Sequence, residues 1–181
     1  MKQQMPSSVL KLVSKLDPEE RVFKEDVRFG SSVPENSVDL VVTSPPYPNM
    51  TDYALSQRLS YYLLGLDPAS DLKNEIGARR KRSARSSIED YLSDMRKANR
   101  VMAERLKPKG YACFVLPEFD QDNENNTLRK KAMQEFLGDL ERCGFGREHT
   151  LSRMLPTRRR HHNQTWTSLE KEAIFIYRKF K

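Results

Sequence analysis

The stretch VVTSPPYPNM places a hydroxyl, two adjacent prolines and a tyrosine directly after a short apolar run. Pro45 and Pro46 fix their own φ angles and have no backbone N–H, so the turn presents carbonyl oxygens on a stiff frame. With the Ser44 hydroxyl, these carbonyls form acceptors that suit an exocyclic amino group, which has two hydrogens to donate. Tyr47 offers a flat face on which a nucleobase could stack. A proline-rich turn whose tyrosine packs into the core remains an equal alternative.

Two basic clusters indicate a polyanionic partner. The chain of 181 residues has a formal net charge of +7. The clusters are Arg79-Arg80-Lys81-Arg82 and Arg158-Arg159-Arg160 with His161. Both lie in segments without hydrophobic periodicity, as we expect for loops that contact phosphates. The alternative is that they are solvated surface loops.

Other chemistries have little support in the sequence. Cys113 and Cys143 lie far apart and have no metal-ligand spacing, so we expect no metal site and a reducing compartment. The sequence has no run of 18 apolar residues, and the start MKQQMPSSVL lacks the apolar core of a secretory signal. We therefore expect no membrane span and a cytoplasmic protein of a bacterial or archaeal interior.

The hydrophobic pattern predicts an α/β fold with a largely parallel sheet and an antiparallel strand pair at its edge. Apolar runs predict strands at 27–29, 38–42, 111–116, 149–154 and 173–177. Helical spacing predicts helices over 6–16, 51–66, 88–106 (with Ser87 as its cap) and 127–143. The Ser44–Tyr47 turn then lies at the carboxyl end of a strand, where ligands bind in open α/β sheets.

The segment around this turn resembles motif IV of the amino-group DNA methyltransferases, which modify N4 of cytosine or N6 of adenine. The likeness rests on TSPPY after the strand DLVV, and the serine form is commoner in the cytosine-N4 branch. The lead-in EDVR…VPENSVDL resembles the family's GDAR…LPDNSVDL, with Glu25 where glycine is usual. Residues 49–53, 75–77 and 106–111 resemble a subgroup of these enzymes, so the likeness spans about residues 25–118.

The resemblance implies a Rossmann-like fold with S-adenosylmethionine as cofactor and DNA as substrate. A target base would leave the duplex at a cost of about a few kcal/mol. Stacking on Tyr47 would return about 1–3 kcal/mol. By this resemblance Ser44, Pro45, Pro46 and Tyr47 form the catalytic turn, and the two basic clusters hold the DNA backbone. It makes Asp26 and Thr43 candidates for cofactor binding.

The family's glycine-rich cofactor turn, Phe-x-Gly-x-Gly, has no counterpart in this chain. The nearest sequence, Cys143-Gly144-Phe145-Gly146, follows a predicted helix, so it is better read as a helix C-cap. In the permuted class of the family the catalytic half precedes the cofactor-binding half. We therefore expect an N-terminal helical segment (1–22) and a catalytic half (23–181), with a second chain that supplies the glycine motif and target recognition and completes the sheet. The alternative is a cofactor pocket assembled without the glycine motif.

Three functions follow from these patterns. The first is the catalytic subunit of a split DNA amino-methyltransferase, with cytosine N4 favoured over adenine N6, in a setting such as restriction–modification. The second is a non-catalytic, nucleic-acid-binding subunit of a methyltransferase complex. The third is an RNA or protein amide methyltransferase, because related Pro-Pro-aromatic turns serve those substrates.

Overall fold

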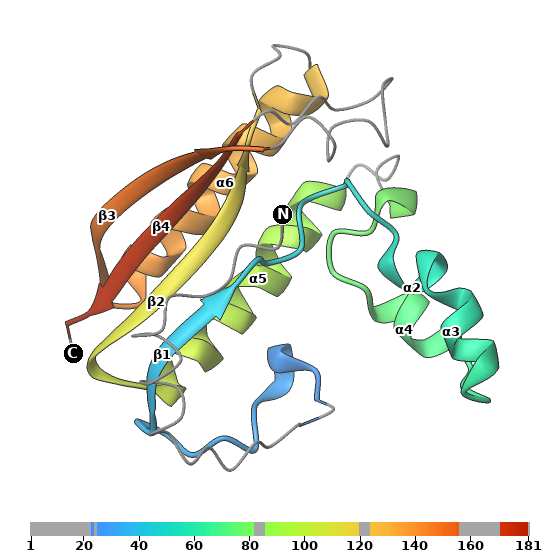
Figure 1. The fold of residues 1–181 in the computed structure, drawn as a ribbon, viewed down its shortest axis with the longest axis horizontal. Coiled ribbons are helices and arrows are strands. Elements are labelled where there is room, and N and C mark those ends of the chain that lie inside the picture. The colour runs from blue at the N-terminus through green and yellow to red at the C-terminus, as the bar shows by residue number, and fades with distance from the viewer. Residues whose placement is uncertain (1–22, 24, 82–85, 120–123, 156–170, 181) are drawn as a thin grey trace, which may run out of the picture.

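The chain folds around one mixed sheet with helices on one of its faces (Figure 1). The computed structural model describes residue 23 and residues 25–81, 86–119, 124–155 and 171–180. The strands are β1 (Val38–Thr43), β2 (Leu106–Glu118), β3 (Phe145–Met154) and β4 (Lys171–Lys179). The helices are η1 (Val27–Phe29), α2 (Tyr53–Ser56), α3 (Arg58–Leu63), α4 (Ala69–Asn74), η2 (Arg79–Lys81), α5 (Ser87–Arg105) and α6 (Glu124–Arg142).

The strand order in the sheet is β1-β2-β4-β3. β1 pairs with β2 in parallel, whereas β4 runs antiparallel to both β2 and β3. This arrangement confirms the α/β class and the antiparallel pair at the C-terminus. The parallel part of the described sheet is a single pairing, because β4 lies between β2 and β3.

The core lies between the sheet and two long helices, α5 and α6 (Figure 1). The ring of Phe114 on β2 meets the ring of Phe136 on α6 edge to face, with 5.4 Å between centroids. The ring of Tyr177 on β4 makes a similar contact with Phe114 at 6.1 Å. All three side chains are fully buried, so truncation of either phenylalanine to alanine costs about 3–5 kcal/mol.

Four expectations about the elements need correction or fall outside the description. Residues 27–29 form a 3₁₀ helix rather than a strand, because the Asp26 side chain accepts the Arg28 N–H and caps a helical turn. The predicted helix over 51–66 is two short helices that meet at Gln57, and its leucines are exposed, with Leu63 at 87%. Ser86, not Ser87, is the residue before α5. The predicted helix over 6–16 lies outside the described residues.

The remaining elements match the pattern, and their ends differ by a few residues. β2 begins at Leu106, immediately after α5, so the strand expected over 111–116 starts five residues earlier. Among the described residues no helix combines the length and apolarity needed to cross a bilayer. The division into residues 1–22 and 23–181 stays a prediction.

Candidate functional site

The Ser44–Tyr47 turn begins at the carboxyl end of β1, beside the neighbouring strand β2. Ser44 follows the last residue of β1, and Thr43 is paired with Phe114 of β2. The hydroxyls of Ser44 and Tyr47 lie 2.7 Å apart. Both hydroxyl oxygens are 3.3 Å from the Val115 carbonyl, so when one hydroxyl donates to the other, the second can donate to Val115. Because Ser44 is exposed, this edge presents a hydroxyl pair to a ligand outside the sheet.

Contacts from distant residues fix the proline frame. The buried Tyr91 of α5 donates its hydroxyl to the Pro46 carbonyl at 3.0 Å. The backbone N–H of Asn49 donates to the Gly77 carbonyl at 2.9 Å. Arg129 of α6 donates to the carbonyls of Pro48 and Asn49 at 3.3 and 3.0 Å. The turn is therefore held from α5, from α6 and from the segment after α4, which gives it little freedom to move.

Tyr47 is half-buried rather than freely exposed. Its side chain packs against the main core cluster, while its hydroxyl faces Ser44. Burial raises the pKa of the Tyr47 phenol, and the hydrogen bond with Ser44 works against that rise. The hydroxyl therefore stays protonated near neutral pH and can donate as well as accept. Part of the ring serves packing, as the alternative reading of the turn expects.

Two residues of the first basic cluster, Arg80 and Lys81, form ion pairs and hydrogen bonds with neighbouring residues of the chain. Arg80 contacts Asp52 at 3.3 Å and Glu75 at 2.8 Å, which leaves its side chain 32% exposed. Lys81 donates to the carbonyls of Lys73 and Glu75. These contacts give Arg80 and Lys81 structural partners, so a role of the pair in phosphate binding stays a prediction. Arg82 lies outside the described residues, and Arg79 is part of η2.

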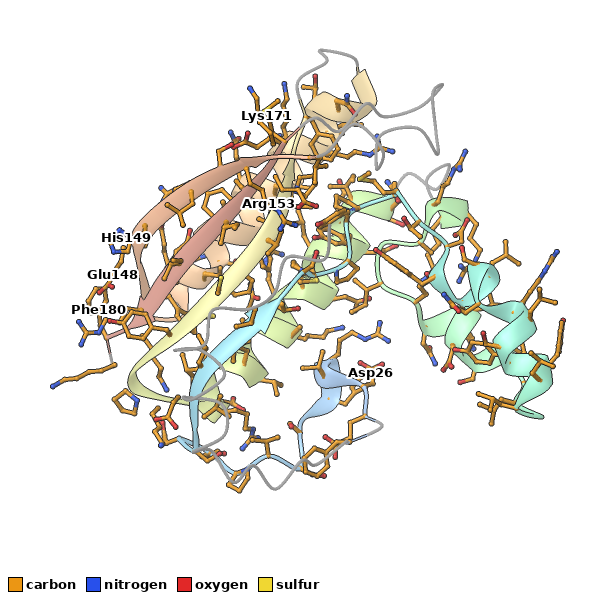
Figure 2. The ribbon with its side chains drawn as sticks, viewed as in Figure 1. Asp26, Glu148, His149, Arg153, Lys171 and Phe180 are labelled. Carbon is orange, nitrogen blue, oxygen red and sulfur yellow. The ribbon has the colours of Figure 1, made fainter. Side chains whose placement is uncertain are left out.

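The second basic cluster, Arg158–Arg160 with His161, lies outside the described residues, but both ends of its connection are described. The connection follows β3 and precedes β4, and Arg153 is paired in register with Glu172. Glu172 is in turn paired with Pro117, three residues beyond Phe114, the partner of Thr43. The connection therefore starts and ends at the same end of the strands as Ser44. Figure 2 labels Arg153 and Lys171 at this end.

The two candidate cofactor residues line different cavities. Asp26 accepts hydrogen bonds from the Arg28 guanidinium and borders a cavity of about 540 Å³ with Tyr53 and Tyr61. Figure 2 shows Asp26 beside η1, away from the four strands. Thr43 borders a second cavity of about 320 Å³ between β1, α5 and η1. The structure does not bring Asp26 and Thr43 together in one pocket.

A glycine-rich cradle for a cofactor is absent from the described residues. All seven glycines are described, and none lies in a turn that leads from a strand into a helix. Gly144, the second residue after α6, has a φ of 89°, and its N–H donates to the Glu141 carbonyl. This geometry confirms that Gly144 ends a helix. The described residues therefore contain no glycine turn of the kind that the resemblance calls for.

Sequence reasoning missed the residues that anchor the turn. Tyr91 reads as one of several apolar residues of a helix, and nothing near Arg129 indicates that it reaches a turn 80 residues earlier in the chain. Among the described residues no three His, Cys, Asp or Glu side chains gather as a metal site would need. Cys113 and Cys143 are free thiols and are half-buried.

Comparisons with known proteins give structural likeness only. No family model and no curated protein matches the sequence. A candidate DNA modification methylase of Thermus thermophilus matches with 21% identity and a TM-score of 0.47, over 86% of this chain and 52% of that one. Its complex with S-adenosyl-L-methionine matches with 18% identity and a TM-score of 0.46, over 86% and 51%.

Two further solved structures are similar at a lower level. The first is a SAM-dependent methyltransferase of Methanosarcina mazei, at 13% identity and a TM-score of 0.43, over 86% of this chain and 65% of that one. The second is the [4+2]-cyclase SpnF, at 12% identity and a TM-score of 0.44, over 84% and 53%. The chain spans about half the length of the Thermus protein.

Proposed function

We propose that this chain carries the methyl-acceptor side of a DNA amino-methyltransferase that uses S-adenosylmethionine, with cytosine N4 favoured over adenine N6. The observation that supports the proposal is the exposed Ser44 hydroxyl at the carboxyl end of β1. It forms a 2.7 Å hydrogen bond with Tyr47 on a proline frame. Hydroxyl and carbonyl oxygens on a rigid frame match an amino group with two hydrogens to place.

The chain's own residues have a simple role in this chemistry. Ser44 and the Pro45 carbonyl accept the two hydrogens of the exocyclic amine, which draws its nitrogen toward sp³ character and directs the lone pair away from the base ring. Tyr47 stacks on the base or hydrogen-bonds its edge. S-adenosylmethionine, when bound, would supply an electrophilic methyl group on a sulfonium. The amine nitrogen is itself the nucleophile that would take the methyl group from the sulfonium, and the proton that it then loses would pass through the Ser44 hydroxyl to solvent. Because the sulfonium is a good leaving group, positioning supplies most of the rate, and no nucleophilic side chain is needed.

The cofactor cradle would come from a partner chain. The described residues contain no glycine turn between a strand and a helix, and β1 is paired on one side only within the described sheet. A partner that brings the cradle to the free side of β1 would place the methyl donor next to Thr43 and Ser44. DNA phosphates would be held by the connection that carries Arg158, Arg159 and Arg160, because it starts and ends at this edge of the sheet.

The test is methyl transfer by the complex of this chain with its partner, using S-adenosylmethionine labelled in the methyl group. Duplex DNA, RNA and protein are offered in parallel, and nucleoside analysis separates N4-methylcytosine from N6-methyladenine. We expect label in DNA and a drop of at least about 100-fold in kcat/KM for Tyr47→Ala. Tyr62→Ala, an exposed tyrosine of α3, serves as the control. Methyl label that appears only in RNA or only in protein would mean that this class of molecule, and not DNA, is the substrate.

A second candidate function is a non-catalytic subunit that only binds nucleic acid. The observation that favours it is the half-burial of Tyr47, since a packed ring with an internally bonded hydroxyl can hold a turn without any chemistry. In that case Ser44→Ala and Tyr47→Phe leave methyl transfer by the complex unchanged, while DNA binding still depends on the basic residues.

A further inference from the structure

Ser44 projects from the face of the sheet that lies opposite α5 and α6. Val41 and Thr43 of β1 line the cavity against α5, so they point toward the helices. Side chains alternate across a strand, so Val42 and then Ser44 point to the opposite face. Val42 is 66% exposed there. The Ser44 hydroxyl therefore opens onto the face away from the helices, at the carboxyl end of β1.

An ion pair lies on the same face, two and three strands away. Arg153 of β3 is paired in register with Glu172 of β4, and Glu172 with Pro117 of β2. Their neighbours Leu116 and Ala173 are buried on the helix side of the sheet. By alternation Pro117 and Glu172 point to the opposite face, and Arg153 shares it because directly paired residues do so. Ser44, Glu172 and Arg153 therefore belong to one surface.

The strand register gives the distance between the hydroxyl and the ion pair. Ser44 lies beside Val115, whose carbonyl is 3.3 Å from the Ser44 hydroxyl, and Val115 is paired with Ile174. Glu172 lies two residues beyond Ile174, toward the carboxyl ends of β1 and β2. With strands about 4.8 Å apart and about 3.4 Å per residue, the Cα atoms of Ser44 and Glu172 are about 12 Å apart. The side chains on both sides narrow this space to that of a single nucleobase.

The charges of the ion pair also act on the neighbouring hydroxyl of Tyr47. Burial is the main cause that raises the pKa of the Tyr47 phenol, and among the smaller causes Glu172 raises it while Arg153 lowers it. The hydroxyl of Tyr47 is 2.7 Å from that of Ser44. The ion pair and the hydroxyl pair are therefore close enough to contact one ligand.

Glu172 orients the Arg153 guanidinium and leaves part of it available. Nε and Nη2 of Arg153 both donate to Oε2 of Glu172, with Nε at 2.9 Å. The Arg153 side chain is 51% exposed, and that of Glu172 is 16% exposed. A guanidinium has five N–H donors in a planar fork, and within the described residues Nη1 donates to no acceptor. The free edge, with one N–H each from Nη1 and Nη2, is thus held in a fixed plane.

We infer that Arg153 determines the choice of cytosine by donating from this free edge to N3 and O2 of the base ring. The N4 amine is held at the same time by Ser44 and the Pro45 carbonyl, and Glu172 is the positioning residue for Arg153. In adenine the atom next to the amine-bearing carbon, N1, is an acceptor, but the following position is a C–H. One donor of the fork then stays unpaired, which disfavours adenine. The inference rests on the proposed function and deepens it, because it names the residue that sets the base preference.

A contact with a DNA phosphate is the competing role for Arg153. A lysine also serves as a phosphate ligand, whereas two neighbouring acceptors on a base edge need the planar fork of an arginine. Glu172 favours the base edge, because its carboxylate offsets the positive charge that would attract a phosphate and fixes the plane of the guanidinium. Arg153→Lys therefore separates the two roles.

The experiment measures methyl transfer by the complex of this chain with its partner on two duplexes. Once the methylated position has been mapped, one duplex carries cytosine there and the other 3-deazacytosine, which keeps the amine and O2 but has a C–H in place of N3. The variants are Arg153→Gln, Arg153→Lys and Glu172→Gln. Arg147→Gln is the matched control, because Arg147 is an exposed arginine at the other end of the same strand.

We expect the unchanged chain to prefer the cytosine duplex in kcat/KM, and Arg153→Gln to reduce this preference by about 10–100-fold. Because each variant is measured on both duplexes, any intrinsic difference in the reactivity of the amine cancels. Arg153→Lys should lose the preference as well. Glu172→Gln should reduce it by about 3–10-fold, since the fork is still present but less well oriented. Arg147→Gln should keep the full preference.

A second readout needs neither S-adenosylmethionine nor the partner. Free deoxycytidine is added at about 10 mM to the full chain, because a ligand this small binds weakly. The Nε–H signal of Arg153, identified by its loss in Arg153→Lys, is followed by NMR. Deoxycytidine should shift this signal, and 3-deazadeoxycytidine should shift it less.

Three results would overturn the inference. The first is an equal preference for cytosine in Arg153→Gln and in the unchanged chain. The second is full preference in Arg153→Lys, which would assign Arg153 to a phosphate. The third is a product that contains only N6-methyladenine. If no methyl group enters DNA while deoxycytidine still shifts the Arg153 signal, the base site stands and only the proposed function is lost. If neither is observed, both are lost.

Discussion

The hydroxyls of Ser44 and Tyr47 lie 2.7 Å apart, and each is 3.3 Å from the carbonyl oxygen of Val115 on the neighbouring strand. The two side chains come from one turn, three residues apart, but the third oxygen comes from β2. The pair is therefore a single unit whose geometry depends on the pairing of β1 with β2. A ligand that hydrogen-bonds Ser44 also changes what Tyr47 can donate to.

Removal of either hydroxyl should show that the two act together. Tyr47→Phe keeps the ring and its packing, so we expect a loss of about 0.5–1.5 kcal/mol in unfolding free energy. Ser44→Ala should cost less, because Ser44 is exposed. In urea unfolding, the double variant should cost less than the sum of the single variants, since both remove the same hydrogen bond. Strict additivity would mean that the hydroxyls do not interact in solution.

The bond from Tyr91 to the Pro46 carbonyl should stabilise the turn. Tyr91→Phe leaves a partly buried carbonyl without its donor, so we expect a loss of about 1–3 kcal/mol and weaker methyl transfer by the complex. Tyr177→Phe is the matched control, because Tyr177 is equally buried but its hydroxyl has no partner within the described residues. That change should be neutral or stabilising. Equal losses for both variants would contradict the anchoring role of Tyr91.

Gly77 should tolerate alanine less well than Gly65 does. The two glycines have nearly the same backbone conformation, with φ of +65° and +66°. A Cβ at Gly77 would lie 2.9 Å from the Tyr91 ring, whereas nothing lies within 4 Å at Gly65. We expect Gly65→Ala to cost about 1–2 kcal/mol for the left-handed conformation. Gly77→Ala should cost a further ~1–3 kcal/mol for the contact. Denaturant unfolding gives both values. Similar losses for the two variants would mean that the Tyr91 ring moves away from the new Cβ without a loss of stability.

The stability of the chain should fall in acid in a way that depends on Asp26. Hydrogen bonds from Arg28 hold the pKa of Asp26 below its ordinary value of 3.8. A carboxyl with a lowered folded pKa stabilises the fold fully above about pH 4 and loses this contribution as the pH falls through the folded pKa. Asp26→Asn should therefore destabilise at pH 7 and make stability less dependent on pH between about 4 and 2. Urea midpoints measured across this range test the sign, and parallel curves would contradict it.

The cluster Arg158–Arg160 should bind DNA without reading its sequence. Replacing the three arginines by glutamine removes up to three phosphate contacts, so the slope of log K against log salt should flatten by about 2–3. Affinity should fall to the same extent for unrelated duplexes. Arg147→Gln is a control, because Arg147 is exposed near the start of β3, at the opposite end of the sheet from Ser44. An unchanged slope would make the cluster a solvated loop.

Local patterns predicted most of the fold. The apolar run before Ser44, the long stripe of α5 and the terminal strand pair all formed, since the period of apolar residues is a property of neighbours in the sequence. The patterns failed where apolar residues have nothing to pack on. Leu59 and Leu63 have helical spacing, but they are exposed on a short α3, and no described element covers them. Asp26 turned the expected strand at 27–29 into a helical turn.

The sequence by itself determined that a rigid, oxygen-rich turn with a tyrosine follows a short apolar strand, because proline geometry and apolar runs act over a few residues. Only the tertiary structure decided which residues contact that turn. Val115, Tyr91 and Arg129 lie from 45 to 81 positions away from the turn residues that they contact. Such contacts depend on how α5, α6 and β2 pack together, and packing sums many weak contacts between distant segments. For the same reason, the unpaired edge of β1 and the position of Arg153 on the same face as Ser44 become visible only in the folded chain.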